Sequence, residues 1–586
     1  MYKNSHIKKL QKILKDHNLD AYVIFTSDPH NSEYISDEFL SLRKYFCPFT
    51  GSAGQVVVTQ REAYLFADGR YWIQAEKELE GTQFKLIKLG DKNAPSLLTF
   101  LKEKNIHNLG VDTRLIVESY AKTLQNEGLK LVCLNLYELF DIEFTKTNEK
   151  IFALDEDLVT LSYQEKIEQI YKEMDKVNAT SHLITTLDDI AYILNLRGKD
   201  IPNNPVFYSY LYLSKKFGNY LFVDKSKVDF ALDGVKIFDY SSIESFLMYH
   251  QEIPTLIDPN RANSFIYNLL LKPINGSNPS YLMKSIKGEK EIKNTKEIQA
   301  LDGVALLKFG KCLKDNIDKN LTEYEYSEIL KQFRLSNSRC FDLSFGSIVA
   351  FGENAAQMHY APTKSVSSVV NKDKIELLVD SGGQYFGGTT DTTRTFIVGT
   401  PTDEFKRDYT LTLKAVINLS KTIFLKGSTG QTIDIRAREY FWKEGMDYKC
   451  GTGHGVGYIL NVHEGPNGFR YKKVVERDDQ GEIVPGMITT IEPGVYKANK
   501  YGIRIENNLL CVKAFETEDG EFFKFETITY VPIDKKGLDL SILTSEEIEW
   551  INSYHKEVYE KLSPLINEES LLEFLKEETS PIVIKK

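Results

Sequence analysis

Cysteine and tryptophan are scarce in this chain, which has six cysteines and three tryptophans among 586 residues. The cysteines form no C-x-x-C pair and are widely spaced: Cys47, Cys133, Cys312, Cys340, Cys450 and Cys511. A chain of this length can bury a large hydrophobic core and does not need disulfides to hold it together. We therefore expect reduced, mostly buried thiols rather than a disulfide framework.

Long hydrophobic runs and an excess of positive charge are also missing. The first twenty residues carry charges every few positions, so they lack the apolar core of a signal peptide, and no later stretch approaches a membrane span. The formal net charge is −10, whereas nucleic-acid binders usually carry a concentrated basic surface. The sequence thus predicts a cytoplasmic protein with no membrane partner and no nucleic-acid partner.

The first half of the chain shows a weak internal repeat. Residues 21–25 and 64–68 are short apolar runs typical of buried strands, and residues 181–185 and 220–224 echo them at similar intervals. This pattern predicts two related α/β domains.

The sequence changes in character from Lys287 onward. A lysine-rich join leads into a long amphipathic helix, and the strands that follow are punctuated by glycine, which favours an α+β unit built on curved antiparallel sheet. We therefore predict three domains: two α/β domains over 1–148 and 149–287, and an α+β domain over 288–586.

Five candidate metal ligands occur in this last region, in apolar or glycine-rich surroundings: Asp380, Asp391, His454, Glu492 and Glu506. Any one of them alone could be a capping or ion-paired carboxylate, or a buried histidine. Four carboxylates gathered together would repel one another, whereas two divalent cations would supply the missing positive charge. An oxygen-rich set with one imidazole and no thiolate favours manganese, cobalt or zinc in a reactive site over a structural zinc.

The ordered motifs around these residues resemble those of the pita-bread metallopeptidases, specifically aminopeptidase P. They are VDSGGQYFGGTTDTTRT, GTGHGVG, NVHEGP, TTIEPGVY and GIRIEN. Upstream, DPHNSEYISDEF, FTGSAG and DGRYWIQA resemble the family's N-terminal domain, and LDDIAYILNLRGKDIPNNPVFYSYL resembles the middle domain of its three-domain cytosolic type. The resemblance implies two creatinase-like α/β domains followed by a pita-bread catalytic domain, and a homodimer formed through that domain.

The resemblance also implies an activity, namely that of an Xaa-Pro aminopeptidase. The enzyme would hydrolyse the bond between an N-terminal residue and a proline at position two, with a metal-bridged hydroxide as nucleophile. Two divalent ions are implied, with Mn²⁺ expected and Co²⁺ or Zn²⁺ as alternatives. Asp380 would chelate one metal, Asp391 and Glu506 would bridge the pair, and His454 and Glu492 would bind the other metal.

Three further residues match substrate-binding positions of the family. His359 in QMHYAP and His463 in NVHEGP would hydrogen-bond the peptide or the oxyanion, as catalytic residues that bind no metal. Arg70 in DGRY would reach the substrate from the N-terminal domain. The alternatives are neutral packed histidines and a structural ion pair of Arg70. Arg504 is expected to support the ligand Glu506.

One residue departs from the family pattern, and two other functions compete with the prediction. Cys450 stands where relatives usually have a histidine before GTGH, which puts in doubt only an accessory contact in the substrate pocket. A non-catalytic pita-bread protein would lack metal ligands, whereas all five match here. A prolidase would cleave only dipeptides, so comparing Xaa-Pro with Xaa-Pro-Xaa separates the two enzymes.

Overall fold

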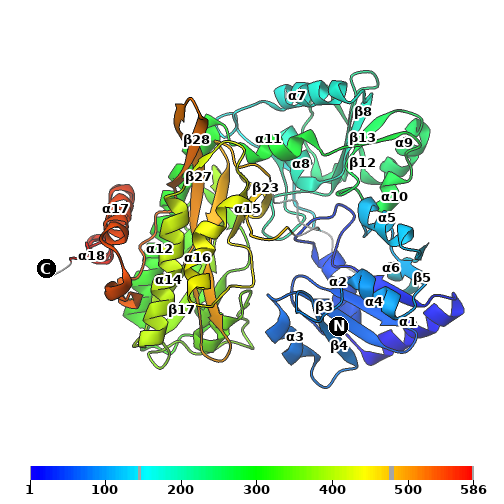
Figure 1. Ribbon diagram of the computed structural model, residues 1–586. Coiled ribbons are helices and arrows are strands. Elements are labelled where there is room, and N and C mark those ends of the chain that lie inside the picture. Colours follow the sequence, from blue (N-terminus) through cyan, green and yellow to red (C-terminus); the bar gives the residue numbers. More distant parts are fainter. Residues whose placement is uncertain (1, 141, 143–146, 474–480, 584–586) are drawn as a thin grey trace. The chain divides into compact units, whose positions relative to one another are not determined.

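The computed structural model describes residues 2–140, 142, 147–473 and 481–583. The chain divides into two compact units, one formed by Met1–Asp155 with Leu161–Tyr281 and the other by Glu156–Thr160 with Leu282–Lys586 (Figure 1). Helix α11 (Pro279–Ser285) spans the boundary in sequence. Among the residues that the structure describes, no helix combines the length and the hydropathy needed to cross a membrane. All six cysteines are free, and three of them are buried.

The first half of unit 1 is a six-stranded sheet in the order β4-β3-β2-β1-β5-β6. Its strands are β1 (Ala21–Ile24), β2 (Gln55–Thr59), β3 (Ala63–Ala67), β4 (Phe84–Lys88), β5 (Asn108–Val111) and β6 (Lys130–Cys133). The helices are α1 (Asn4–Asp16), α2 (Asp37–Phe46), α3 (Trp72–Leu79), α4 (Leu97–Glu103), α5 (Glu118–Asn126) and α6 (Leu136–Phe140). Every residue of β1 is buried, because β1 lies in the middle of the sheet.

The second half of unit 1 repeats this arrangement in the order β12-β11-β10-β8-β13-β14. Its strands are β8 (Ser181–Ile184), β10 (Ser209–Leu213), β11 (Asn219–Val223), β12 (Val235–Asp239), β13 (Thr255–Ile257) and β14 (Pro273–Asn275), beside a small β7 (Phe152–Ala153) and β9 (Leu196–Arg197) pair. The helices are α7 (Tyr163–Lys176), α8 (Leu187–Leu194), α9 (Ile243–His250) and α10 (Ser264–Tyr267).

The two sheets share their strand directions as well as their order. In each, the two pairings that begin at the central strand, β1-β2-β3 or β8-β10-β11, are antiparallel, and the remaining three pairings are parallel. The internal repeat predicted from the sequence is therefore confirmed.

The first long helix of unit 2 is α12 (Glu289–Asn316), which was expected after Lys287. The other helices are α13 (Glu323–Leu335), α14 (Asp403–Ser420), α15 (Gly430–Ile433), α16 (Ile435–Lys443), α17 (Ser545–Leu562) and α18 (Glu569–Glu578). The strands form three sheets and one hairpin: β15-β18-β19, β16-β17-β20, β21-β28-β27-β24-β22-β23 and β25-β26. All described strand pairings in this unit are antiparallel, as predicted.

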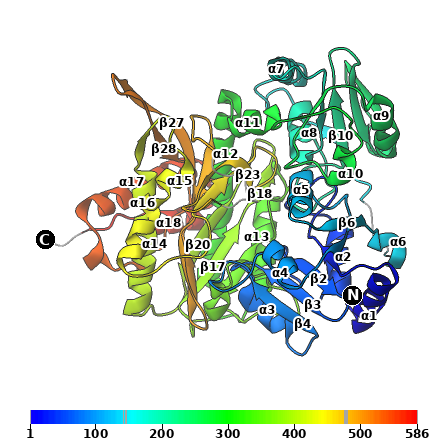
Figure 2. The same cartoon turned by 45° about the vertical axis from the view of Figure 1, so that its right-hand side comes forward.

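The strands of unit 2 have the following bounds. They are β15 (Cys340–Leu343), β16 (Ile348–Phe351), β17 (Glu376–Ser381), β18 (Gly383–Tyr385), β19 (Gly388–Thr389), β20 (Thr392–Ile397), β21 (Ile423–Leu425), β22 (Gly453–Gly455), β23 (Glu464–Phe469), β24 (Ile488–Ile491), β25 (Gly494–Lys497), β26 (Tyr501–Arg504), β27 (Asn507–Thr517) and β28 (Gly520–Thr527). Figures 1 and 2 show the β27-β28 ribbon extending beyond the rest of this unit.

The largest hydrophobic core of unit 2 joins α14 and α16 to the six-stranded sheet and to α17 and α18. Helix α14 begins after Thr402, whose side chain accepts the N–H of Phe405, and most of its residues are buried. Gly303 allows α12 to pack closely, since a Cβ there would lie 2.2 Å from the carbonyl oxygen of Tyr530. These helices support the strands that carry the candidate ligands.

Candidate metal centre

Three of the five predicted ligands converge on one point. One donor atom each of Asp391, His454 and Glu506 lies within 4.8 Å of the other two. Asp391 immediately precedes β20, His454 is the central residue of β22, and Glu506 lies between β26 and β27. The convergence therefore depends on the tertiary fold, because each residue comes from a different sheet or loop.

His454 faces two carboxylates with one ring nitrogen. Its Nε2 lies 3.4 Å from Oδ2 of Asp391 and 3.4 Å from Oε1 of Glu492. Its Nδ1 lies 2.9 Å from the carbonyl oxygen of Gly455, which can only accept a hydrogen bond. The proton therefore belongs on Nδ1, and the lone pair of Nε2 is available to a metal ion.

Asp380 completes the carboxylate group from the strand β17, where it pairs with Thr393 on β20. Its Oδ2 accepts a hydrogen bond of 2.6 Å from Nη2 of Arg504. Its Oδ1 is buried and has no hydrogen-bond partner among the described residues. A buried carboxylate oxygen without a donor is costly, so this atom fits a ligand that brings positive charge.

The electrostatics of the centre also favour cations. Burial raises the pKa of Asp391 well above its usual range, and the negative charges of Asp380 and Glu492 raise it further. Burial likewise raises the pKa of Glu506, and the negative charges of Asp391 and Asp380 raise it further. Bound divalent ions would offset both causes. The donor set thus fits a pair of divalent metal ions.

A polar network links these ligands, and two of its members, Thr393 and Tyr496, were not predicted from the sequence. Thr393 donates from Oγ1 to Oε2 of Glu506 at 2.7 Å and accepts from Nε of Arg504 at 3.1 Å. Arg504 also donates to the hydroxyl of Tyr496 at 2.8 Å. Arg504 therefore contacts Asp380 directly and reaches Glu506 through Thr393. The signal available in the sequence was the position of Thr393, two residues after Asp391 and near the start of an expected strand.

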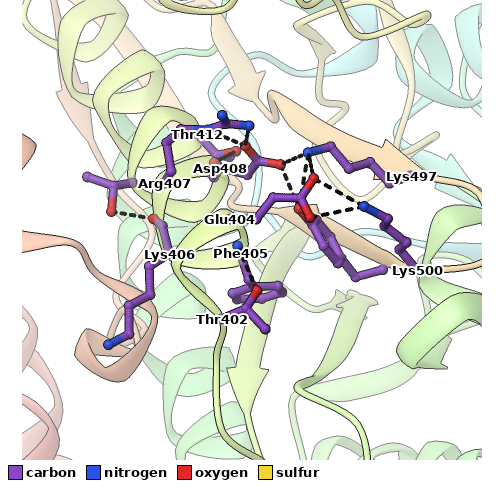
Figure 3. Close-up of polar contacts among 11 residues, drawn as sticks. Thr402, Glu404, Phe405, Lys406, Arg407, Asp408, Thr412, Lys497 and Lys500 are labelled. Atoms are coloured by element: carbon purple, nitrogen blue, oxygen red, sulfur yellow. Dashed lines mark hydrogen bonds and ion pairs between the residues drawn. The ribbon is translucent and has the colours of Figure 1, made fainter.

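The hairpin β25-β26 separates two of the ligands, since Glu492 precedes it and Glu506 follows it. Near its turn, Lys497 donates to Glu404 at 2.8 Å and lies 2.5 Å from Oδ2 of Asp408, both on α14 (Figure 3). The side chain of Asp408 is fully buried and also accepts from the hydroxyl of Tyr501. Helix α14 therefore anchors the end of the hairpin opposite the ligands.

The two predicted substrate-binding histidines occupy different surroundings. The ring centroid of His463 lies 4.2 Å from that of His454, in an edge-to-face arrangement. His359 is half-buried and follows Met358, whose carbonyl oxygen lies 3.5 Å from Nη2 of Arg504. Both histidines thus belong to the neighbourhood of the ligands, and their roles toward substrate stay predictions.

Arg70 lies in unit 1, where it donates from Nε and Nη2 to the two oxygens of Asp68 at 2.9 and 2.7 Å. This two-point ion pair accounts for the guanidinium structurally, so the substrate role of Arg70 stays a prediction.

Cys450 lies between α16 and β22. Its carbonyl oxygen accepts a hydrogen bond of 2.6 Å from Nη2 of Arg438. Burial, and then the negative charge of Glu492, raise the pKa of its thiol to about 12. The side chain is therefore a neutral thiol at physiological pH, where a histidine would be able to carry a proton.

Comparisons with known proteins cover almost the whole chain. Residues 293–513 match metallopeptidase family M24, and residues 521–582 match the C-terminal region of peptidase M24. Residues 6–139 and 145–291 each match the creatinase/prolidase N-terminal domain.

Full-length relatives agree with these matches. A probable Xaa-Pro aminopeptidase P of Tuber melanosporum is 36% identical, with 99% of each chain covered. Xaa-Pro aminopeptidase 1 of Dictyostelium discoideum is 36% identical, over 98% of this chain and 96% of that protein. The crystal structure of an X-prolyl aminopeptidase from Caenorhabditis elegans, described as a cytosolic enzyme with a di-nuclear active site, matches with a TM-score of 0.92, 30% identity and 99% coverage of each chain. The chain therefore belongs to metallopeptidase family M24 and, within it, to the aminopeptidase P (Xaa-Pro aminopeptidase) family.

Proposed function

We propose that this chain removes the N-terminal residue from peptides whose second residue is proline, with two divalent metal ions at the centre described above. The observation that carries the proposal is the convergence of Asp391, His454 and Glu506, together with a buried oxygen of Asp380 that has no hydrogen-bond partner in the described part of the chain. This group contains no serine, cysteine or threonine, and together its donors suit a pair of hard cations. The family relationship supports the choice of substrate.

Each of the five candidate ligands would have its own role in binding the two ions. Asp380 would hold one ion, His454 and Glu492 the other, and Asp391 and Glu506 would bridge the two. Bound there, the two ions would supply Lewis acidity and an activated water at neutral pH. The oxygen-rich donor set supports Mn²⁺ as the native metal, with Co²⁺ and Zn²⁺ as alternatives.

The protein's own groups would orient the peptide. His463, packed against the ring of His454, and His359 would donate hydrogen bonds that strengthen as charge develops on the attacked carbonyl oxygen. A proline at position two has no N–H to bind, so orientation would depend on the α-amino group, the carbonyl oxygen and the ring. Arg504 would hold Asp380 in place through its 2.6 Å hydrogen bond.

A peptide panel tests this function. Peptides that vary at positions one and two are incubated with metal-free protein and with added Mn²⁺, Co²⁺ or Zn²⁺. Cleavage of Xaa-Pro-Xaa after the first residue supports the proposal, and cleavage confined to Xaa-Pro dipeptides would instead indicate a prolidase. The homodimer and the role of Arg70 stay predictions.

A further inference from the structure

A buried ion pair involves Glu464, the residue that follows His463. Nζ of Lys287 is 2.5 Å from Oε1 of Glu464, and each side chain is only 1% exposed. Lys287 precedes α12, and Glu464 is the first residue of β23. The contact therefore joins the start of the long helix to an edge strand of the six-stranded sheet.

Glu464 is placed to influence both histidines through the backbone. It directly follows His463, and on the neighbouring strand it pairs with Gly455, the residue after His454. The register shifts between His454 and Gly455, which marks an irregularity in β22 at this point. A Cβ on Gly455 would lie 2.0 Å from the carbonyl oxygen of Glu464, so the two backbones are in close contact.

This contact reaches the imidazole of His454 in one further step. The carbonyl oxygen of Gly455 accepts the hydrogen bond from Nδ1 of His454 and so selects the ring nitrogen that faces the carboxylates. A shift of Glu464 would displace Gly455 and thereby rotate the imidazole.

The backbone of Lys287 is fixed as well as its side chain. Its N–H donates to the carbonyl oxygen of Gly486 at 3.0 Å, in the turn before β24. Strand β24 leads to the candidate ligand Glu492. Lys287 therefore connects β23 with the start of β24, and these strands flank β22 and His454.

A pair buried to this degree pays a large desolvation cost, so it often adds little net stability compared with apolar residues of similar size. Its more specific effect is to fix the position of both partners. We propose that Lys287, which belongs to no ligand or substrate motif, is a positioning residue: by holding Glu464 it sets the β22-β23 backbone that aims His454 at the metal pair and places His463 beside it. This inference rests on the proposed function of the centre.

The test compares Lys287→Met and Lys287→Arg in the full-length protein. We expect Lys287→Met to bind Mn²⁺ about 10- to 100-fold more weakly in calorimetric titrations of metal-free protein, with a similar loss of kcat, as is typical when a ligand's supporting contact is removed. Lys287→Arg should keep most of the Mn²⁺ affinity and most of the kcat, because it retains a buried cation.

Lys414→Met is the matched control. Lys414 forms another largely buried pair, 2.6 Å from Oε2 of Glu547, between α14 and α17. We expect this variant to lose thermal stability but to bind Mn²⁺ as the wild type does. If Lys287→Met and Lys414→Met lose the same amount of Tm and the same amount of Mn²⁺ affinity, Lys287 is only a general stabilising residue. That result would overturn the inference.

Two further measurements keep the outcomes separate. If Lys287→Met does not fold, Lys287→Met combined with Glu464→Leu removes both buried charges, and it should fold yet show the same loss of Mn²⁺ affinity. Hydrogen exchange of metal-free protein should be at least about tenfold faster at the β22 and β23 amides of Lys287→Met, with α17 unchanged. Unchanged exchange and unchanged Mn²⁺ affinity contradict the inference. A wild type that binds no Mn²⁺ contradicts the proposed function instead, and the exchange data still decide whether Lys287 positions these strands.

Discussion

Nε2 of His454 lies 3.4 Å from Oδ2 of Asp391, although His454 is in β22 and Asp391 is in the segment between β19 and β20. Charge-assisted hydrogen bonds in proteins are shorter, about 2.7–2.9 Å, so this is not a closed ion pair. With its proton on Nδ1, the imidazole turns a lone pair toward the carboxylate. Two acceptors that face each other in this way are expected where a cation binds between them.

Removing either proposed bridging carboxylate should abolish activity. Asp391→Asn and Glu506→Gln each remove a negative charge from between two cations while keeping the shape of the side chain. Because changes to supporting residues around metal ligands already cost about 10–100-fold, we expect a loss of more than about a hundredfold in kcat. Metal content by mass spectrometry should fall as well. Either variant with two bound metals and wild-type turnover would refute the bridging assignment.

The two non-ligand histidines should separate metal binding from catalysis. We expect His359→Ala and His463→Ala each to retain close to the normal metal content and to lose about a hundred- to a thousandfold in kcat. Such a loss corresponds to about 2.7–4 kcal/mol of transition-state stabilisation, which is typical of one oxyanion donor. Loss of metal would make these residues ligands, and an unchanged kcat would show that they are merely packed in the structure.

The anchor between α14 and the β25-β26 hairpin should matter more at Lys497 than at Lys500. Lys497 contacts the fully buried Asp408, whereas the side chain of Lys500, itself 56% exposed, contacts the partly exposed Glu404. We expect Lys497→Met to lower the free energy of unfolding of unit 2 by about 1–3 kcal/mol, less than for a fully buried pair because Lys497 remains partly exposed.

Lys500→Met is the matched control and should cost less than about 1 kcal/mol, as exposed ion pairs usually do. Urea unfolding followed by tryptophan fluorescence measures both variants. Equal losses in the free energy of unfolding would show that the burial of Asp408 does not strengthen the contact between α14 and the hairpin.

Acid should destabilise unit 2 through His555. Burial lowers the pKa of His555 to about 3, and its Nε2 accepts the N–H of Ile533 at 3.1 Å. The unfolded chain has a histidine pKa of about 6.5, so between these values it binds a proton that the folded protein does not. The resulting stability is complete above pH 6.5 and falls by about 1.4 kcal/mol per pH unit as the pH drops toward 3.

His555→Gln keeps an acceptor for Ile533 and removes the titration. Urea unfolding of metal-free protein between pH 7 and pH 5 should therefore give a shallower pH dependence for the variant. Parallel curves for the two proteins would contradict the role of His555.

The sequence predicted the parts of this protein that depend on local patterns. The strand repeat in the first half, the helix after Lys287 and the antiparallel character of the last domain follow from hydrophobic periodicity and glycine placement. The family resemblance likewise follows from the ordered motifs that contain the five candidate ligands. These features need no knowledge of how distant segments pack.

The supporting contacts could not be predicted in the same way. Thr393 reaches Glu506, and Lys287 reaches Glu464, only because the tertiary fold brings together segments that are far apart in sequence. A lysine in a lysine-rich join is expected to be solvated, yet Lys287 is almost fully buried. Arg504 was expected to support Glu506 and does so through Thr393, but its direct contact with Asp380 was not predicted. Such contacts depend on the tertiary structure, which local patterns in a single sequence do not indicate.

The central claim is that this chain cleaves Xaa-Pro bonds by means of bound metal. Its most direct test follows four peptides by mass spectrometry: Xaa-Pro-Xaa, Xaa-Ala-Xaa, N-acetylated Xaa-Pro-Xaa and the dipeptide Xaa-Pro. We expect metal-stripped protein to cleave none of them. Two equivalents of Mn²⁺ should restore cleavage of the free Xaa-Pro-Xaa peptide at its first bond, and neither the alanine peptide nor the acetylated peptide should be cleaved. Turnover by the metal-free protein, or cleavage that ignores the proline and the free α-amino group, would contradict the account.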